Sequence, residues 1–171
     1  MKKIFFLFLV FAFFLCGCTH KENVSMSSAT LLIMGGHGRN PCVFKILSDG
    51  TLEVTTGPLH TVRFGEAHYT DDDYFTEDAQ RKSTRISRKN KERIESLISQ
   101  VKETGDPEYD QPQGVDDGVI VYATIDNVGY MALYKNDIIF YGEKNTELSD
   151  LAEILFDISP IKVKGFEGKQ T

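Results

Sequence analysis

Apolar and polar residues alternate most clearly over residues 42–56, which read CVFKILSDGTLEVTT. Two runs with apolar residues at every second position flank the pair Asp49-Gly50. Asp-Gly between alternating runs is a strong hairpin signal, because both residues tolerate the left-handed backbone that tight turns need. The pattern therefore predicts two antiparallel strands joined by a short loop.

The length of this loop follows from which residues would face each other. A two-residue turn at Asp49-Gly50 would place Lys45 opposite Val54, a charged residue beside an apolar one. A three-residue loop with Gly50 in the left-handed conformation pairs residues of like polarity across the strands, which keeps one face apolar. We therefore predict a three-residue loop, Ser48 to Gly50, and the pairs Ile46–Leu52, Lys45–Glu53 and Phe44–Val54.

Four other segments have the composition of strands. TLLIM at residues 30–34 is a short apolar run that ends at two glycines, and LHTVRF at 59–64 is a candidate fourth strand. Residues 119–142 read as a meander of three strands, and the first of these, 119–125, is apolar on both faces, which is typical of a central strand. PIKVK at residues 160–164 is a candidate edge strand.

Apolar residues spaced three and four apart predict two helices. The first begins after Ser87, a residue type that caps helix N-termini, and stops before Gly105 and Pro107. The second covers 147–157, with Asn145 or Thr146 as its cap and Pro160 after its end. The buried stripes are expected to be Ile94, Leu97, Ile98 and Val101 in the first helix, and Leu148, Leu151, Ala152 and Leu155 in the second.

The order of these elements predicts an α+β fold. Strands joined as hairpins outnumber helices, so we expect a mostly antiparallel sheet with both helices packed on one face. Residues 30–171 are long enough for one domain with a substantial core. Between the predicted strands and the first helix, residues 65–85 read as a long polar loop, with an acidic cluster followed by a basic one.

The N-terminus has a different pattern, an uninterrupted apolar run from Ile4 to Cys16 preceded by Lys2 and Lys3. A membrane-spanning helix needs about 20 apolar residues, so this run is too short to span. A basic start followed by a short apolar core is typical of a secretory signal peptide. We therefore predict that residues 1–17 are a cleaved signal.

The signal ends in Leu15-Cys16-Gly17-Cys18, which resembles the lipobox of bacterial lipoproteins. The resemblance implies that the Cys18 thiol receives a diacylglycerol, that the signal is cut before Cys18, and that the protein is anchored to a membrane outside the cytoplasm. Cys16 stands where alanine or serine is usual, and the site is otherwise intact. Beyond about residue 22, the chain resembles small bacterial lipoproteins in general pattern only.

This assignment changes the cysteine count and the charge. Cys42 alone keeps a free thiol, so no intramolecular disulfide can form, and its apolar context predicts a buried side chain. Residues 18–29 are expected to comprise the lipidated cysteine and a flexible tether. Without Lys2 and Lys3 the chain has 17 basic and 25 acidic residues, a net charge of −8, which argues against binding to nucleic acid or anionic headgroups.

Candidate chemistry is sparse. GGHGRN at residues 35–40 could cradle a phosphate, but Pro41 and a strand follow it where a phosphate-binding loop would open a helix, so a turn is favoured. Three of the four histidines and the acidic residues near them match no known zinc spacing, and the acidic run lacks the pattern of a calcium loop. We expect no catalytic residue, no metal site and no cofactor. The histidines and acids considered are His37, His60, His68, Asp71, Asp72 and Asp73.

Aromatic and acidic residues of the polar loop suggest a contact surface for a partner. Aromatic rings recur at protein interfaces, and carboxylates would favour a basic partner. The leading hypothesis is a non-catalytic binding or inhibitory module for an extracytoplasmic protein, peptide or glycan. A metal-assisted hydrolase and a structural envelope component are the alternatives. The candidate contact residues are Tyr69, Asp71, Asp72, Asp73, Tyr74 and Phe75.

Overall fold

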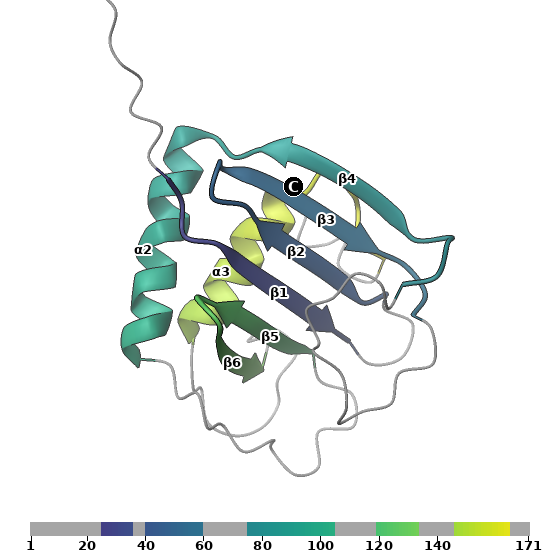
Figure 1. Cartoon of the computed structure of the whole chain (residues 1–171). Helices are drawn as coiled ribbons and strands as arrows, with labels where there is room; N and C mark the ends of the chain where they lie inside the picture. The colour runs from purple at the N-terminus through teal and green to yellow at the C-terminus, as the bar shows by residue number, and fades with distance from the viewer. Residues whose placement is uncertain (1–24, 36–39, 60–74, 105–118, 134–145, 165–171) are drawn as a thin grey trace, which may run out of the picture.

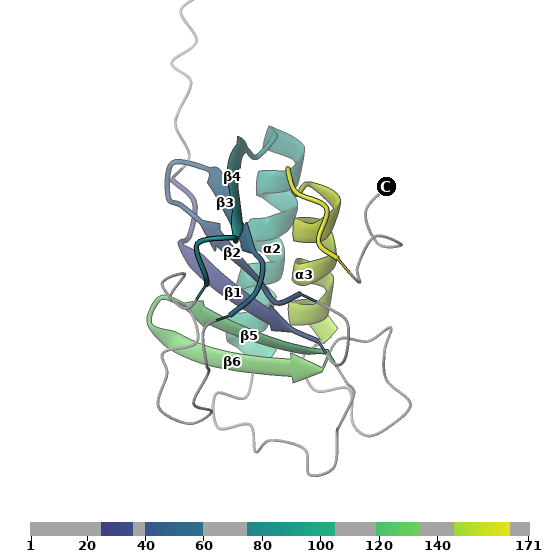
Figure 2. The same ribbon diagram turned by 90° about the vertical axis from the view of Figure 1, so that its right-hand side faces the viewer.

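The computed structural model of the chain describes residues 25–35, 40–59, 75–104, 119–133 and 146–164. The strands among these residues form one antiparallel sheet in the order β4-β3-β2-β1-β5-β6 (Figure 1). Two helices, α2 (Arg88–Thr104) and α3 (Thr146–Asp157), pack on one face of the sheet (Figure 2). The predicted α+β class and the placement of both helices are therefore confirmed. The strands are β1 (Ala29–Met34), β2 (Cys42–Ile46), β3 (Thr51–Thr56), β4 (Gln80–Arg85), β5 (Ile120–Ile125) and β6 (Val128–Leu133).

The β2–β3 hairpin has the predicted register and loop. Leu47 donates its backbone N–H to the Thr51 oxygen at 2.9 Å, and this bond closes a loop of three residues. Gly50 has a φ of 82°, the left-handed conformation that the loop requires. The backbone N–H of Thr51 also donates to Oδ1 of Asp49 at 2.8 Å. The pairs Ile46–Leu52, Lys45–Glu53 and Phe44–Val54 all occur.

Replacing Gly50 with valine should lower the free energy of unfolding by about 1–3 kcal/mol, because a β-branched residue is strained at positive φ. A Cβ at this position would also collide with the Lys91 side chain, which lies over the loop. Urea unfolding of Gly50→Val measures the total. The same change in a Lys91→Ala background removes the collision and leaves only the backbone strain. A loss of only a few tenths of a kcal/mol would contradict the assigned loop.

The main core lies between the sheet and the two helices. The predicted stripes of both helices are buried there, which confirms all eight positions. Phe44 of β2 and Phe156 of α3 meet edge to face, with ring centroids 5.2 Å apart. Such aromatic pairs add to the stabilisation that burial alone provides. This contact joins α3 to the middle of the sheet.

A smaller apolar cluster lies on the opposite face of the sheet. Leu32 and Val43 are its buried strand residues, and Phe75 covers them. Met34, Leu59, Ala79 and Tyr122 pack around the cluster and are partly buried. This face is therefore partly apolar and partly polar, because the neighbouring row across the strands contains Thr30, Lys45 and Glu53.

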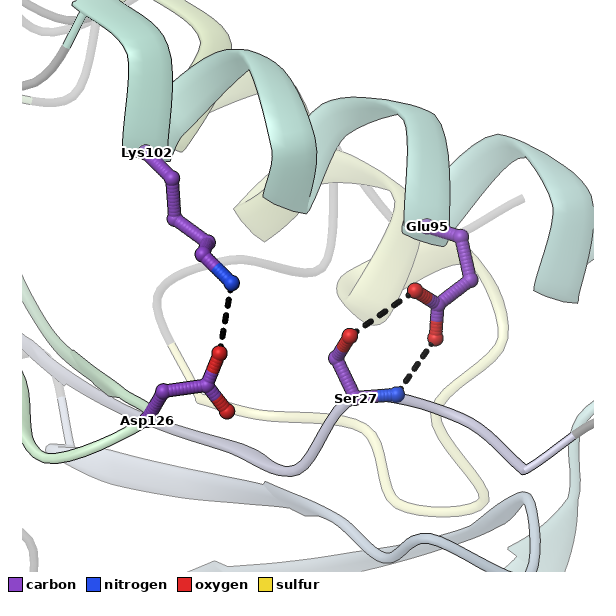
Figure 3. Close-up of polar contacts among 4 residues, drawn as sticks. All are labelled: Ser27, Glu95, Lys102 and Asp126. Atoms are coloured by element: carbon purple, nitrogen blue, oxygen red, sulfur yellow. Dashed lines mark hydrogen bonds and ion pairs between the residues drawn. The ribbon is translucent and has the colours of Figure 1, made fainter.

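Polar contacts cap the start of helix α2 and hold the helix in place. The hydroxyl of Ser87 accepts the backbone N–H of Asn90 at 3.3 Å, as expected of the N-cap. Further along, Glu95 accepts two hydrogen bonds from Ser27, and Lys102 contacts Asp126 in the β5–β6 turn at 2.5 Å (Figure 3). The helix is thereby fixed to the start of β1 and to the β5–β6 turn.

Three predictions about segment boundaries need correction. Residues 80–85 are strand β4, although the whole of 65–85 was expected to be loop. The prediction of a strand over 160–164 is wrong, since this segment is irregular and buries Ile161 and Val163 in the main core. Residues 26–29, expected to belong to the tether, are part of the domain, because Met26 is buried in the core and β1 begins at Ala29.

The other strand predictions agree where they can be compared. β1 corresponds to the predicted strand at 30–34, and β5 lies between β1 and β6, which confirms its central position. Leu59 forms an isolated bridge with Phe75, whereas residues 60–64 lie outside the described residues. The third strand of the predicted meander, after β6, also lies outside them.

Candidate functional site

Most residues expected to contact a partner or a ligand lie outside the described residues. These are Cys18, Tyr69, Asp71, Asp72, Asp73 and Tyr74, together with His37, His60 and His68. Within the described ranges, no group of three or more His, Cys, Asp or Glu side chains is arranged to hold a metal ion. The hypothesis that the polar loop contacts a partner and the hypothesis of a metal-assisted hydrolase therefore remain predictions.

Phe75 is the one predicted contact residue that the structure describes, and it needs correction. Its side chain is only 4% exposed and packs against Leu32 and Val43. The sequence suggested an exposed ring because its neighbours are polar. The ring instead covers apolar residues on the open face of the sheet and offers no surface to a partner.

Cys42 is buried, as predicted, and is a free thiol. Burial raises the pKa of this thiol well above its ordinary value, because the charged thiolate would lose its hydration. Since the thiolate is the reactive form, Cys42 is protected from oxidation and alkylation in the folded chain. It acts as a small apolar residue of β2.

The exposed edge of the sheet at β4 offers backbone hydrogen-bonding groups to a partner. Ile86 donates its N–H to the Gly50 oxygen at 3.0 Å, which sets the phase of the β3–β4 ladder. Hydrogen-bonded pairs alternate in an antiparallel ladder, so Arg81, Ser83 and Arg85 direct their N–H and C=O groups away from β3. In the part of the chain that the structure describes, no strand pairs with this outer edge.

Sequence reasoning missed β4 because the strand has no apolar alternation. All of its residues except the half-buried Thr84 are exposed, so its side chains have no core to face. The available signal was the basic run that continues into α2, with seven basic and one acidic residue between positions 80 and 93. Basic side chains on an edge strand oppose pairing between copies of the chain, because like charges would meet.

A second surface lies where the chain enters β1, and we call it the entry end. It comprises residues 25–28, the loop at 47–51, the turn at 126–127 and the first turn of α2. Met26 donates its backbone N–H to the Ser48 oxygen at 2.9 Å, which holds residues 25–28 against the loop at 47–51. The register places Ala29 beside both Ile46 and Ile125, so both hairpin turns lie at this end.

Charges at the entry end are arranged around the β2–β3 loop. Nη1 of Arg85 lies 3.1 Å from Oδ2 of Asp49 and also donates to the Asp49 backbone oxygen at 2.6 Å. Hydrogen bonds from Thr51 lower the pKa of Asp49, and the nearby positive charges of Arg85 and Lys91 lower it further. Asp49 is therefore ionised at neutral pH and offsets part of the local positive charge.

Neither α2 nor α3 combines the length and the apolar character that a helix needs to cross a bilayer. Compared with known proteins, the chain matches no family model, and no curated protein and no solved structure is significantly similar to it. Two features of the chain itself are candidate functional surfaces. These are the open edge of β4 and the entry end.

Proposed function

We propose that this chain is a lipid-anchored protein of the bacterial envelope that binds another protein or peptide without catalysing a reaction. The lipobox-like sequence around Cys18 supports the anchor and the extracytoplasmic location. The open edge of β4 is the single observation that supports the binding role. A strand edge is a ready-made binding site, because an extended peptide can continue its hydrogen-bond ladder.

The geometry of β4 suits strand addition. Arg81, Ser83 and Arg85 present three N–H and three C=O groups at alternate positions, which is the pattern that an incoming strand needs. The strand is also held firmly, since it pairs with β3 over six residue pairs from Thr51–Arg85 to Thr56–Gln80. A rigid template reduces the entropy that a partner loses on binding.

The charge of β4 defines the partner. Arg81, Lys82 and Arg85 are exposed, and the strand has no acidic residue. An acidic extended segment would meet complementary charge along this edge, whereas a second copy of β4 would be repelled. We therefore propose an acidic strand of another envelope protein as the ligand. Tyr69, Asp71 to Asp73 and Tyr74 stay proposed contacts for residues of that partner beyond its paired strand.

Removing a single backbone N–H donor of β4 tests this proposal. The N–H of Ser83 points away from β3, so Ser83→Pro removes a group that a partner would use while keeping the β3 ladder. The matched control, Ser83→Ala, removes the hydroxyl and keeps the N–H. We expect a synthetic peptide of alternating Glu and Val to bind the intact chain. Ser83→Pro should weaken this binding roughly tenfold, and Ser83→Ala should leave it within about twofold.

Fluorescence anisotropy with the labelled peptide gives the affinities, and thermal unfolding shows that both variants are folded. Equal affinities for Ser83→Pro and Ser83→Ala would contradict strand addition at β4. A peptide of alternating Lys and Val that binds as tightly would contradict the proposed charge preference. Cleavage of the peptide that is lost in His68→Ala would favour the hydrolase instead.

A further inference from the structure

We propose that the entry end is a docking surface for the anionic lipid headgroups of the membrane that holds Cys18. The inference rests on the proposed lipid anchor and goes beyond it. An anchor alone leaves the domain free to rotate above the bilayer. A docked domain would have one fixed orientation, with the entry end towards the lipid.

The reach of the chain between the anchor and the domain is the first argument. The expected tether extended to Ala29, but Met26 is buried and Ser27 donates two hydrogen bonds to Glu95, at 2.6 and 2.9 Å. Only the seven residues after Cys18 up to Ser25 remain between the lipid and the domain. Fully extended, they span at most about 25 Å. The point where the chain enters the domain therefore stays within about 25 Å of the anchored cysteine.

The apolar surface at this end is the second argument. Among the described residues, the exposed large hydrophobic side chains are Leu47, which is 36% exposed, and Val128, which is 40% exposed. Both belong to the entry end, Leu47 in the β2–β3 loop and Val128 directly after the β5–β6 turn. Exposed apolar side chains at the tips of turns can enter the headgroup region at little cost to the fold.

Charge is the third argument. The net charge of the chain argued against anionic lipids, yet that sum hides an uneven distribution. Arg85, Arg88, Lys89 and Lys91 follow one another at the end of β4 and the start of α2, and Lys91 lies over Gly50. Asp49 and Glu92 neutralise two of these charges through ion pairs with Arg85 and Arg88. Lys89 and Lys91 have no ion-pair partner among the described residues, and the Lys91 side chain lies over Gly50 in the loop that follows Leu47. We call these two lysines and this loop the basic corner.

The lipid surface suits this corner better than a protein partner does. Anionic headgroups attract basic side chains only within about a Debye length, near 8 Å at physiological salt. The short tether keeps the corner within a few such lengths of the membrane at all times. No other partner has its encounter guaranteed by the connectivity of the chain. The acyl chains and the basic surface then act together in one attachment.

Fluorescence energy transfer from the domain to the membrane, measured on the lipidated mature chain, tests the proposal. A fluorescent donor is attached at Ser99→Cys, an exposed position on α2, and an acceptor is placed in the lipid. Cys42 is buried and does not compete for the label. The chain is reconstituted into vesicles of phosphatidylcholine alone or with roughly one third phosphatidylglycerol. We expect at least twofold more transfer with phosphatidylglycerol, and loss of this excess at 0.5 M salt, where screening is stronger.

Two matched charge variants locate the surface. Lys89→Gln/Lys91→Gln removes the two unpaired charges at the entry end and should reduce the ratio of docked to undocked protein roughly tenfold or more. Lys162→Gln/Lys164→Gln removes two exposed charges at the opposite end of β2, where the backbone oxygen of Lys164 accepts the backbone N–H of Asn40, and should have no effect. Leu47→Ser, which keeps all charges, should lower the transfer in both lipid mixtures.

The outcomes separate this inference from the proposed function. Equal transfer in both lipid mixtures, for a chain that floats with both kinds of vesicle, would overturn docking and leave the anchor intact. A chain that floats with neither would overturn both. Equal losses in the two charge variants would also overturn docking at the entry end. If soluble polyglutamate alone protects Lys89 and Lys91 from acylation and phosphatidylglycerol does not, the corner binds an acidic protein instead. Binding of the Glu-Val peptide to β4 should be unchanged in Lys89→Gln/Lys91→Gln.

Discussion

Replacing Cys18 with alanine should abolish incorporation of a radioactive fatty acid and move the protein from the membrane into a soluble or unprocessed pool. The expected loss is complete, because the thiol of Cys18 is the proposed attachment point of the diacylglycerol. Each buried methylene contributes about 0.8 kcal/mol, so two or three acyl chains anchor firmly and their removal leaves only weak contacts. Metabolic labelling followed by membrane fractionation measures both effects.

Cys16→Ala is the matched control for this experiment. It removes the neighbouring cysteine and replaces it with a residue that is usual at that position of a lipobox, so labelling should persist. Label retained in Cys18→Ala would contradict the anchor. If Cys16→Ala alone lost the label, the lipid would be attached to Cys16 and not to Cys18.

Phe44→Ala should lower the free energy of unfolding by about 3–5 kcal/mol, the largest stability loss that we expect from a single truncation. The Phe44 side chain is fully buried at the centre of β2, and its ring meets Phe156 edge to face at 5.2 Å. The change removes apolar area and leaves a cavity between the sheet and α3. Urea unfolding of the mature chain gives the value.

A second aromatic truncation refines the result. Phe156→Ala should cost a comparable amount, and the double variant should cost less than the two single changes together, because both remove the same contact. Glu53→Ala, at an exposed position on the neighbouring strand, should change stability by no more than about 0.5 kcal/mol. A loss below about 1 kcal/mol for Phe44→Ala would place Phe44 outside the core.

The sequence predicted correctly those parts of the fold in which burial gives the apolar residues a regular spacing. The β2–β3 hairpin was predictable to the residue, because a one-residue slip would put Lys45 against Val54. The helices were predictable for the same reason, since Ile94, Leu97, Ile98 and Val101 all face the core. Cys42 was predictable from its apolar neighbours.

The parts that were missed depend on backbone pairing or on local context. β4 is defined by its hydrogen bonds to β3 and has no buried face, so its side chains show no alternation. Residues 160–164 show the reverse, since Ile161 and Val163 are buried without any strand. Met26 was assigned to the tether because a single apolar residue among polar ones shows no spacing that would indicate a helix or a strand.

The candidate surfaces were less predictable than the fold. The basic run was visible in the sequence, but its position depends on β4 being an edge strand and on α2 beginning beside the β2–β3 loop. Net charge pointed the other way, because it averages over the whole chain. Phe75 was taken for an exposed contact because local polarity does not reveal packing across the sheet against Leu32 and Val43.

The central position of β1 has a mechanical consequence under the proposed anchor at Cys18. β1 begins a few residues after the tether and pairs with β5 over all six of its residues and with β2 over five, Ala29 to Ile33. A pull on the domain away from its anchor acts along β1 and loads both ladders in shear, so many hydrogen bonds must yield together. A tether joined to an edge strand would instead peel one ladder apart bond by bond. With the proposed anchor, tension therefore reaches the domain through a strand that is paired on both sides.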